Sequence, residues 1–412
     1  MSDISKRLRP ESTDLSGSDV LVDILSRLPV KSLRRFQCAS KSWHALISHS
    51  HFVKKHLSLI NNTTNSFKLI FETRPLQSLD YQVLLKYLKE DYGAPIAPTE
   101  LDYPVKTPNS SLLIFGSCNG LICLQFDKTD IVLWNPCTGE SNLLPQATIF
   151  DGVHDCGSIF YGFGYDSKAE DYKVMRGGFK GEYGSDGYSW RLETIIEVFS
   201  LKNGSWRSTQ VSDMDLAIEG QGCLVNETLH WVDDDNHAAI IISFDLVEEK
   251  FNEAVHCLCT IQTDSEIFFG GVLNIRNCVA VYSSNSEDLG ILSDSGTSKK
   301  EDKIWMIKEY DVHDYWTEVA TVISEGFFNP FCISEGGQVL GMLGGILGWY
   351  SPKENIFKNI TEIRDRWSGA TKYVETIVSP VTGNGAAAGE SAMASTVEKE
   401  GVKDRGGCVL RN

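Results

Sequence analysis

The chain has 412 residues, of which 42% are hydrophobic and 23% charged, so it can bury a sizeable core and is not a disordered protein. Its formal net charge of −17 is unevenly distributed. Residues 1–60 carry ten Lys/Arg against five Asp/Glu, a net of +5, and the remainder carries 28 against 50, a net of −22. An acidic body of this kind argues against binding to nucleic acid or to an anionic membrane, because both would repel it.

The first 17 residues are polar, and we expect them to be disordered. They lack the apolar run of a secretory signal, and no stretch approaches the ~18 apolar residues that a membrane span needs. The eleven cysteines are an odd number and are scattered, so we expect reduced thiols in a protein of the cytoplasm, the nucleus or both.

Residues 18–60 read as three or four short helices. Ser18 is a candidate N-cap for the first, which carries a helical stripe of Val20, Leu21, Ile24, Leu25 and Leu28 and is ended by Pro29. The next segment, VKSLRRFQCA, places Val30, Leu33, Phe36 and Cys38 on one face. Ser40 is expected to cap a third helix that carries Trp43, Leu46 and Ile47, and Ser50 to cap a fourth.

So small a helical unit buries its apolar stripes poorly by itself. The pattern leaves two interpretations open: the helices dock on the body of the same chain, or they present an apolar face that a partner protein covers.

The run DILSRLPVKSLRRFQCASKSWHALI, followed by FVKKHL, resembles the F-box of plant F-box proteins. The resemblance implies that this unit docks on the Skp-type adaptor of a cullin–RING ubiquitin ligase. The adaptor-binding residues that it implies are the apolar positions Leu28, Pro29, Leu33, Phe36, Cys38, Trp43 and Ile47, flanked by Lys31 and Lys41. Some of these positions are expected to hold the helices together. Family members usually have Leu-Pro ahead of the first helix, where this chain has Ser16-Gly17.

Residues 61–380 are organised by a weak internal repeat. One half of the repeat is a tight hairpin between apolar strands, as in GSCNGLICL (116–124), GCLVNETLHWV (222–232), VLNIRNCVAVY (272–282) and CISEGGQVLGML (332–343). The other half is an apolar strand that ends in an aromatic residue and a polar turn, as in IVLWNPCTGE (131–140) and ILGWYSPKENIF (346–357). With a related pair at 160–175 and 196–207, five such units recur.

This repeat predicts an α plus all-β protein, with the helical unit followed by a β-propeller of six or seven blades. Five aromatic residues share one position in the repeat and are expected to pack between blades: Trp134, Phe199, Phe244, Tyr310 and Tyr350. Residues 67–115 would hold a degenerate first blade, closed by the last strand near TKYVETIVS. A large β-sandwich is the alternative fold. Residues 381–412 are small and polar, and we expect a disordered tail.

Several segments of the β body, including LWNPCTGE, FGYDSKAEDYKVMR and EVFSLKNGSWR, resemble the F-box-associated region of the same plant family. That family includes pollen self-incompatibility F-box proteins and regulators of immune-receptor turnover. The resemblance implies a kelch-like β domain that binds a target protein, and the motifs do not identify the target.

Motifs of metal and nucleophilic catalysis are missing from the sequence, and no cofactor is expected. Cys257 and Cys259 lie on one face of a predicted strand without further ligands nearby, and DDDNH (233–237) reads as a solvated turn. The Gly-rich segment 177–187 reads as a long loop. Loops at 177–191 and 283–303 are the candidate target-binding surface, which would favour a basic partner.

We therefore predict a substrate-recognition subunit of an SCF-type ubiquitin ligase, which binds the adaptor and a target protein and performs no catalysis itself. The alternative is a propeller-based sugar-binding or hydrolytic protein with an incidental helical head. An F-box protein that acts as an adaptor-bound scaffold without a ligase is a third possibility.

Overall fold

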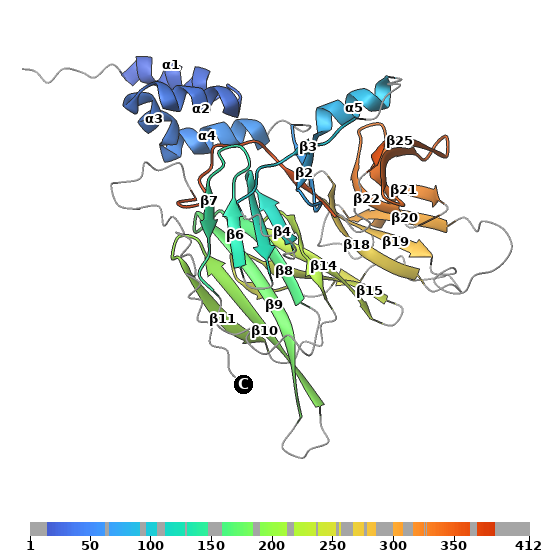
Figure 1. The fold of residues 1–412 in the computed structure, drawn as a ribbon. Helices are drawn as coiled ribbons and strands as arrows, with labels where there is room; N and C mark the ends of the chain where they lie inside the picture. The colour runs from blue at the N-terminus through green and yellow to red at the C-terminus, as the bar shows by residue number, and fades with distance from the viewer. Residues whose placement is uncertain are drawn as a thin grey trace, which may run out of the picture.

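The computed structural model describes residues 15–383 with internal gaps. The residues outside the description are 1–14, 62–65, 91–95, 105–111, 128–129, 147–158, 184–189, 212–217, 236–237, 253–254, 257–266, 276–277, 286–299, 308–315, 325, 327, 363–368 and 384–412. A head of four helices lies against a ring of β-sheets (Figure 1).

The head contains the helices predicted from the sequence. They are α1 (Leu15–Leu25), α2 (Val30–Ala39), α3 (Lys41–Ser48) and α4 (Ser50–Asn61). In Figure 1, α4 is the helix nearest to the ring and α1 lies on the side away from it. Because α1 begins at Leu15, the prediction of disorder up to residue 17 is wrong for its last three residues.

The ring consists of six sheets, which are the blades of a propeller. Blade 1 contains β1 (Lys68–Phe71), β2 (Gln77–Asp80), β3 (Thr99–Glu100) and β26 (Ala370–Tyr373). Blade 2 contains β4 (Leu112–Cys118), β5 (Leu121–Phe126), β6 (Asp130–Trp134) and β7 (Ser141–Leu143). Blade 3 contains β8 (Ile159–Asp166), β9 (Asp171–Tyr183), β10 (Trp190–Ser200) and β11 (Ser205–Val211), with β12 (Gly220–Gln221) parallel to β8.

The remaining three blades follow the same antiparallel order. Blade 4 contains β13 (Cys223–Val225), β14 (Thr228–Asp235), β15 (Ala238–Asp245), β16 (Lys250–Phe251) and β17 (Val255–His256). Blade 5 contains β18 (Ile267–Ile275), β19 (Cys278–Asn285), β20 (Lys300–Ile307) and β21 (Trp316–Ser324). Blade 6 contains β22 (Phe328–Ile333), β23 (Val339–Leu343), β24 (Ile346–Ser351) and β25 (Ile356–Glu362). The six-bladed ring confirms the propeller and replaces the alternative of a sandwich.

The last strand of the chain closes the ring, as predicted. β26 pairs with β1 in an antiparallel register, from Lys68 opposite Tyr373 to Phe71 opposite Ala370. The blade therefore takes its innermost strand from the C-terminal end of the chain and its other strands from the N-terminal end. This pairing joins the two ends of the domain, so the ring has no open edge at the join.

A helix that the sequence interpretation missed, α5 (Tyr81–Lys89), seals the join between blades 1 and 6. The indole N–H of Trp349 donates a hydrogen bond of 2.9 Å to the carbonyl of Leu84, and the Tyr87 hydroxyl donates one of 2.8 Å to the carbonyl of Asn359. The Phe71 and Phe331 rings meet edge-on with centroids 6.2 Å apart beneath it.

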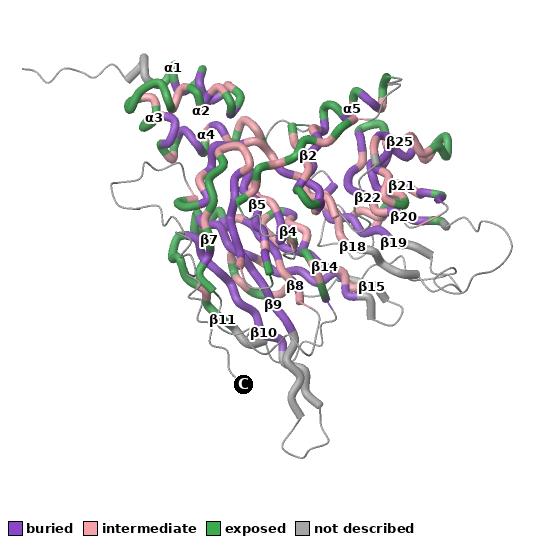
Figure 2. Tube along the Cα trace, in the orientation of Figure 1, coloured by how far each residue is buried: buried purple, intermediate pink, exposed green. Residues whose placement is uncertain are grey.

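The repeated aromatic position has the predicted role in four blades. Trp134, Phe199, Phe244 and Tyr350 all lie near the end of the third strand of their blade and are buried. Figure 2 shows that the strands are mostly buried along their central parts. Tyr310 lies outside the described residues. The aromatic repeat is therefore part of the packing that holds the blades together.

Two predicted loop segments are strands. Residues 177–183 belong to β9, and a side chain at Gly177 would lie only 2.1 Å from the Phe160 ring, so glycine is needed there for packing. Asp233, expected in a solvated turn, lies in β14 and is buried. Composition alone misled both predictions, because Gly and Asp favour loops unless tertiary contacts override them.

Candidate functional site

Local signals at the helix ends position the head residues. The Ser40 hydroxyl accepts a hydrogen bond of 3.2 Å from the backbone N–H of Trp43, which confirms Ser40 as the N-cap of α3. Two other predicted caps are wrong. Ser18 lies inside α1, and α4 already includes Ser50, so His49 precedes it and its ring Nδ1 accepts from the backbone N–H of His51 at 3.3 Å. Boundaries of this kind shift by a residue or more because serine tolerates the first turn as well as the cap.

The predicted adaptor-binding residues divide into buried and accessible groups. Leu33 and Ile47 are 0% exposed and form the core of the head with residues of the other helices. Any contribution of these two side chains to binding is therefore made through the shape of the head. The residues that remain partly or fully exposed are Leu28, Pro29, Lys31, Phe36, Cys38, Lys41 and Trp43.

The aromatic pair of Phe36 and Trp43 joins α2 to α3. Their ring centroids are 5.1 Å apart with the planes inclined at 40°, and both side chains are half-buried. The pair contacts the edge of the head core and leaves part of each ring accessible. These side chains can thus both stabilise the head and contact a partner.

An exposed apolar strip on α1 was not among the predicted site residues. Val20 and Ile24 are 57% and 58% exposed, and Leu21 is exposed beside them. We call Val20, Leu21 and Ile24 the outer face of the head. The i, i+4 spacing revealed these residues as a stripe, but only the packed structure shows that this part of the stripe points away from the chain.

A buried histidine fixes the turn between α1 and α2. His56 of α4 is buried, and its Nε2 lies 3.2 Å from the carbonyl oxygen of Leu28, to which the N–H tautomer donates. Burial lowers the pKa of His56 below its usual value, because desolvation outweighs the hydrogen bond that favours the charged ring. The neutral ring therefore holds Leu28 and Pro29 in position on the surface.

The head binds to turns at one end of the ring through charged side chains. Lys54 of α4 forms an ion pair of 2.6 Å with Glu170, which lies in the turn between β8 and β9. Arg34 of α2 donates a hydrogen bond of 3.3 Å to the carbonyl of Thr138 and lies 3.8 Å from Glu140, both in the turn between β6 and β7. These are surface pairs, and each contributes little to stability but helps to orient the head.

A segment after β26, residues 374–383, lies between the head and the ring, and we call it the strap. Its Ile377 and Val378 are buried in one apolar cluster with residues of the head and of blades 2 and 3. The buried Asn135 amide donates hydrogen bonds to the strap carbonyls of Thr376 and Val378, at 3.1 and 2.8 Å. The asparagine of the LWNPCTGE motif is thus a clamp for the strap.

A second motif, FGYDSKAEDYKVMR, forms buried ion pairs within blade 3. The Lys173 ammonium lies 2.6 Å from the Asp166 carboxylate and 2.7 Å from that of Glu249 in blade 4. Burial alone would raise the pKa of Asp166, but hydrogen bonds from Lys173 and from the backbone N–H of Ala169 lower it below its usual value. Arg176 is paired with Glu197 at 2.8 Å, also buried. The pair of Lys173 and Glu249 joins blade 3 to blade 4, and the other two pairs brace blade 3 from inside.

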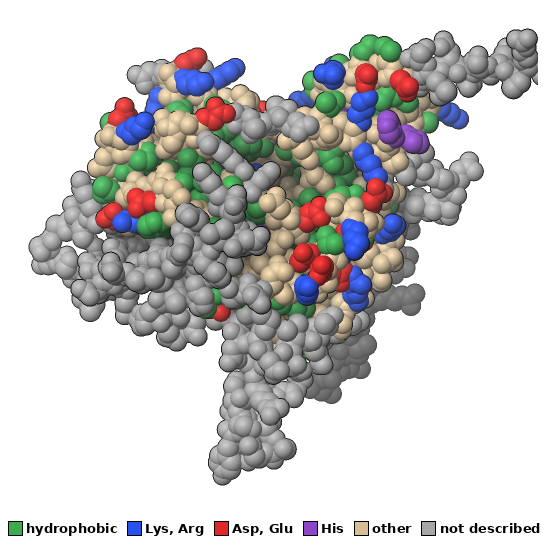
Figure 3. All heavy atoms as spheres, turned by 180° about the vertical axis from the view of Figure 1, so that it is seen from behind, with side chains coloured by type: hydrophobic (Ala, Val, Ile, Leu, Met, Phe, Trp, Pro, Cys, Tyr) green, Lys and Arg blue, Asp and Glu red, His purple; other side chains and the backbone are tan. Residues whose placement is uncertain are grey.

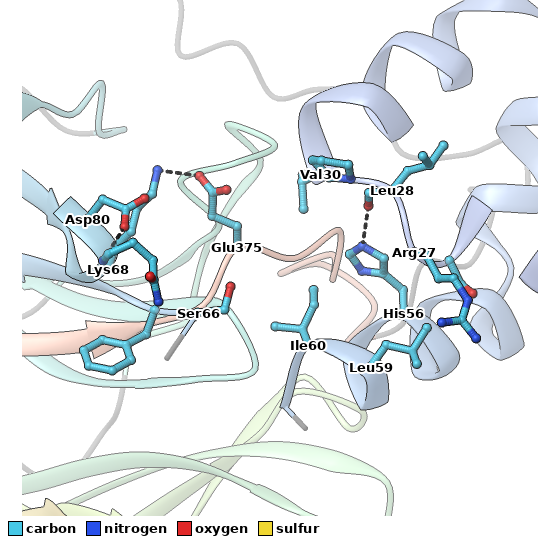
Figure 4. A pocket seen from close by; sticks show the side chains of 14 residues that line it. Arg27, Leu28, Val30, His56, Leu59, Ile60, Ser66, Lys68, Asp80 and Glu375 are labelled. Atoms are coloured by element: carbon cyan, nitrogen blue, oxygen red, sulfur yellow. Dashed lines mark hydrogen bonds and ion pairs between the residues drawn. The ribbon is translucent and has the colours of Figure 1, made fainter. Parts of the chain in front are cut away.

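A cavity of about 420 Å³ separates the head from blade 1 (Figure 4). The loop 26–30 and His56, Leu59 and Ile60 of α4 line one side. Lys68 and Glu375, paired at 2.6 Å, line the other side with Asp80. The carboxylate of Asp80 accepts from the backbone N–H of Gln82 at 2.8 Å and so caps α5. Lys68, Glu375 and Asp80 therefore already have partners in the chain.

The charges of the head differ from those of the ring. Residues 19–61 contain seven Lys/Arg and two Asp, and basic side chains are visible on the head at the upper right of Figure 3.

Among the residues that the structure describes, no group of three His, Cys, Asp or Glu side chains is arranged to hold a metal ion. Cys257 and Cys259 lie outside that part of the chain. Within the same part, no helix has the length and hydropathy needed to cross a membrane.

Comparison with known families assigns both parts of the chain. Residues 18–55 match the F-box domain, and residues 96–340 match the F-box associated beta propeller domain. The second match omits β1, β2, β24, β25 and β26, so the structure adds most of the blade that closes the ring and the last two strands of blade 6.

The chain is similar to named plant proteins along most of its length. It is 31% identical over 323 residues to F-box protein CPR1 of Arabidopsis thaliana, covering 74% of this chain and 72% of that protein. It is 26% identical over 386 residues to an F-box/kelch-repeat protein of the same plant, covering 88% and 95%. A solved structure of a nidogen/laminin complex aligns with a TM-score of 0.41 and 12% identity, over 76% of this chain and 99% of that one.

Proposed function

Because the chain belongs to the plant F-box proteins that carry an F-box-associated β-propeller domain, we propose that it is the substrate-recognition subunit of an SCF-type ubiquitin ligase. In this role the head binds a Skp-type adaptor, through it a cullin–RING ligase, and the ring binds a target protein. The observation that carries the proposal is the head itself, a helical unit with an exposed apolar strip that is fixed on a propeller. The protein would act in the cytoplasm, the nucleus or both.

The outer face of the head is the proposed centre of the adaptor contact. Val20, Leu21 and Ile24 are exposed although they are apolar, and a cluster of exposed apolar side chains indicates a protein interface. Pro29 and the Phe36–Trp43 pair provide further accessible apolar surface on the head. The basic residues of the head, including Lys31 and Lys41, would favour an adaptor with an acidic rim.

The target is proposed to bind at the end of the ring opposite the head. The head contacts the turns between β6 and β7 and between β8 and β9. Of the predicted target-binding segments, residues 184–189 and 286–299 lie outside the described residues. The strands that flank them, β9 with β10 and β19 with β20, are joined at the opposite end of the blades, where β9 and β10 extend away from the head (Figure 1). A target bound there would leave the adaptor side free.

The ring and the head would accelerate ubiquitin transfer by position alone. The strap and the ion pairs of Lys54 and Arg34 fix the head relative to the ring. A target held by such a unit experiences a raised local concentration of the charged conjugating enzyme. In this mechanism no side chain of the chain exchanges a proton or forms a covalent bond, and the subunit is non-catalytic.

Binding to a purified Skp-type adaptor tests the proposal. The double variant Val20→Asp/Ile24→Asp places two charges on the outer face without entering the core, and we expect adaptor binding to weaken at least tenfold. Leu143→Asp is the matched control, because Leu143 is 63% exposed on β7 of the ring and should bind like the wild type. Absence of adaptor binding by the wild-type chain, or equal binding by the double variant, would contradict the proposal.

A further inference from the structure

The central channel of the ring contains a cavity of about 570 Å³ that the proposed function does not use. It lies at the head-side mouth of the channel, where Asn61 at the end of α4 is part of its wall. Its other walls come from the innermost strands and the segments beside them. The polar side chains of the wall include Ser117, Asn119, Gln221, Asn274, Thr371 and Lys372. The volume lies within the usual range of small-molecule sites.

Lys372 of β26 reaches across the channel. Its ammonium donates a hydrogen bond of 2.8 Å to the carbonyl of Asn274 in blade 5, although its own strand belongs to blade 1. The ammonium also lies 5.5 Å from the centre of the Phe67 ring. Asn274 is in turn fixed by a hydrogen bond of 2.9 Å from its Nδ2 to the carbonyl of Leu224 in blade 4. The position of the charge is therefore set before any ligand binds.

The cavity is positive in an otherwise acidic protein. Among the described residues that line it, Lys372 is the single charged side chain. Burial raises the pKa of the thiols of Cys118 and Cys223, which also line it, to about 12, so both are neutral at pH 7. Beyond these groups the walls are amide, hydroxyl and apolar groups, including the rings of Phe163 and Phe331. An anion that enters meets an attractive charge and no carboxylate in these walls.

Three of the innermost strands are irregular beside this cavity. The register of β4 shifts between Ile114 and Gly116, that of β18 between Phe269 and Gly271, and that of β22 between Pro330 and Cys332. Bulges redirect side chains and leave backbone groups outside the ladder, and they are frequent next to binding sites. Gly116 and Phe331, from two of these bulges, are part of the cavity wall.

We propose that the channel mouth binds a small organic carboxylate, with Lys372 pairing with the carboxylate and the neighbouring amide and hydroxyl groups binding the rest of the molecule. One lysine matches the single charge of a carboxylate. A phosphate dianion is usually met by several cationic groups, an arginine fork or a helix N-terminus, and the described walls contain none of these. The aromatic walls suit the carbon skeleton of such an acid.

The full-length protein can be titrated by calorimetry with the monocarboxylates acetate, butyrate and benzoate at constant ionic strength, with butyramide as the uncharged probe and inorganic phosphate as the second anion. We expect at least one carboxylate to bind and to raise the melting temperature, and butyramide and phosphate to have no effect. Binding of butyramide equal to that of butyrate, binding of phosphate alone, or binding of none of the three acids would overturn the proposal.

A matched pair of variants separates binding from a purely bracing role of the lysine. Lys372→Met should weaken carboxylate binding at least tenfold. Lys358→Met is the control, because Lys358 also donates to two backbone carbonyls, of Tyr87 and Glu90, and lies 5.2 Å from a ring centre, but it does not line the channel. If Lys372 is only a brace, both variants lower the melting temperature and the wild type binds no acid. Unchanged affinity in Lys372→Met would also refute the site.

Discussion

Replacing Asn135 by Ala should destabilise the protein strongly, because its buried side chain holds the strap on the ring. Asn135 is 0% exposed. Its amide donates to the carbonyls of Thr376 and Val378 at 3.1 and 2.8 Å, and its Oδ1 accepts from the backbone N–H of Cys137 at 2.8 Å. The truncation leaves two buried carbonyls and one part-buried N–H without this partner. At about 1–3 kcal/mol for each group, less what entering water recovers, we expect a loss of about 4 kcal/mol.

The assay is urea unfolding at pH 7 combined with hydrogen exchange of the strap amides. Asn142→Ala is the control, because Asn142 also donates to the strap, to the carbonyl of Pro380 at 3.1 Å, but it is only half-buried. We expect the control to cost about 1 kcal/mol or less and to leave exchange at Ile377 and Val378 slow. Equal losses for the two variants, or unchanged exchange of the strap in Asn135→Ala, would refute the inference that Asn135 clamps the strap.

The variant Asn135→Asp sharpens the same test by its pH dependence. The introduced carboxylate keeps the acceptor for Cys137 but opposes two carbonyl oxygens where the amide donated. Its folded pKa should therefore be raised, because the charged form is both buried and repelled. The variant should be least stable relative to wild type at neutral pH and should recover as the pH falls and the acid is protonated.

Three further predictions concern the ring and the head. Lys173→Met removes the cation between the buried carboxylate of Asp166 and the half-buried one of Glu249, and it should cost about 3–5 kcal/mol at pH 7. Because Lys173 lowers the pKa of Asp166, that cost should shrink as the pH falls below about 4, which denaturant midpoints at several pH values would show. Gly120→Ala should cost about 2–4 kcal/mol by thermal melting, because Gly120 has a φ of +82° and a Cβ would lie 2.7 Å from the carbonyl oxygen of Val374; a loss below 1 kcal/mol would contradict this reasoning. Ser40→Ala should cost about 1 kcal/mol through the lost cap of α3, and Ser40→Gly less, measured by the same melts.

The two helical interpretations of the head turn out to be compatible. Leu33 and Ile47 share one apolar cluster with residues of the ring, as expected if the helices dock on the body of the same chain. Val20 and Ile24 are exposed, which leaves the apolar face that the second interpretation requires. The sequence pattern could not separate them, because a stripe at helical spacing is the same whether its neighbour is the ring, the strap or another protein.

The repeat of hairpins and aromatic residues was enough to predict the propeller and its closing strand. Turn residues such as Asn119 and Gly120 adopt the positive φ values that their types favour, with φ of 51° and 82°, so the local sequence determined the hairpins. Residues 67–115 were assigned to a degenerate first blade, closed by a strand near Thr371. β26 includes Thr371 and pairs with β1 of that blade. The helix α5 was missed because its residues were assigned to that blade, and its stabilising contacts come from blade 6.

What the sequence by itself determined about this protein is therefore local: four helices, the hairpins, the order of the blades and the F-box motif, all of which depend on spacing and on the conformational preferences of nearby residues. Only the tertiary structure decided which apolar residues face outward on α1, that Asn135 clamps a strap some 240 residues later in the chain, and that Lys372 crosses the channel to Asn274. Burial and long-range hydrogen bonds are properties of the packed chain, because each depends on residues that are far apart in the sequence and meet only when the chain folds.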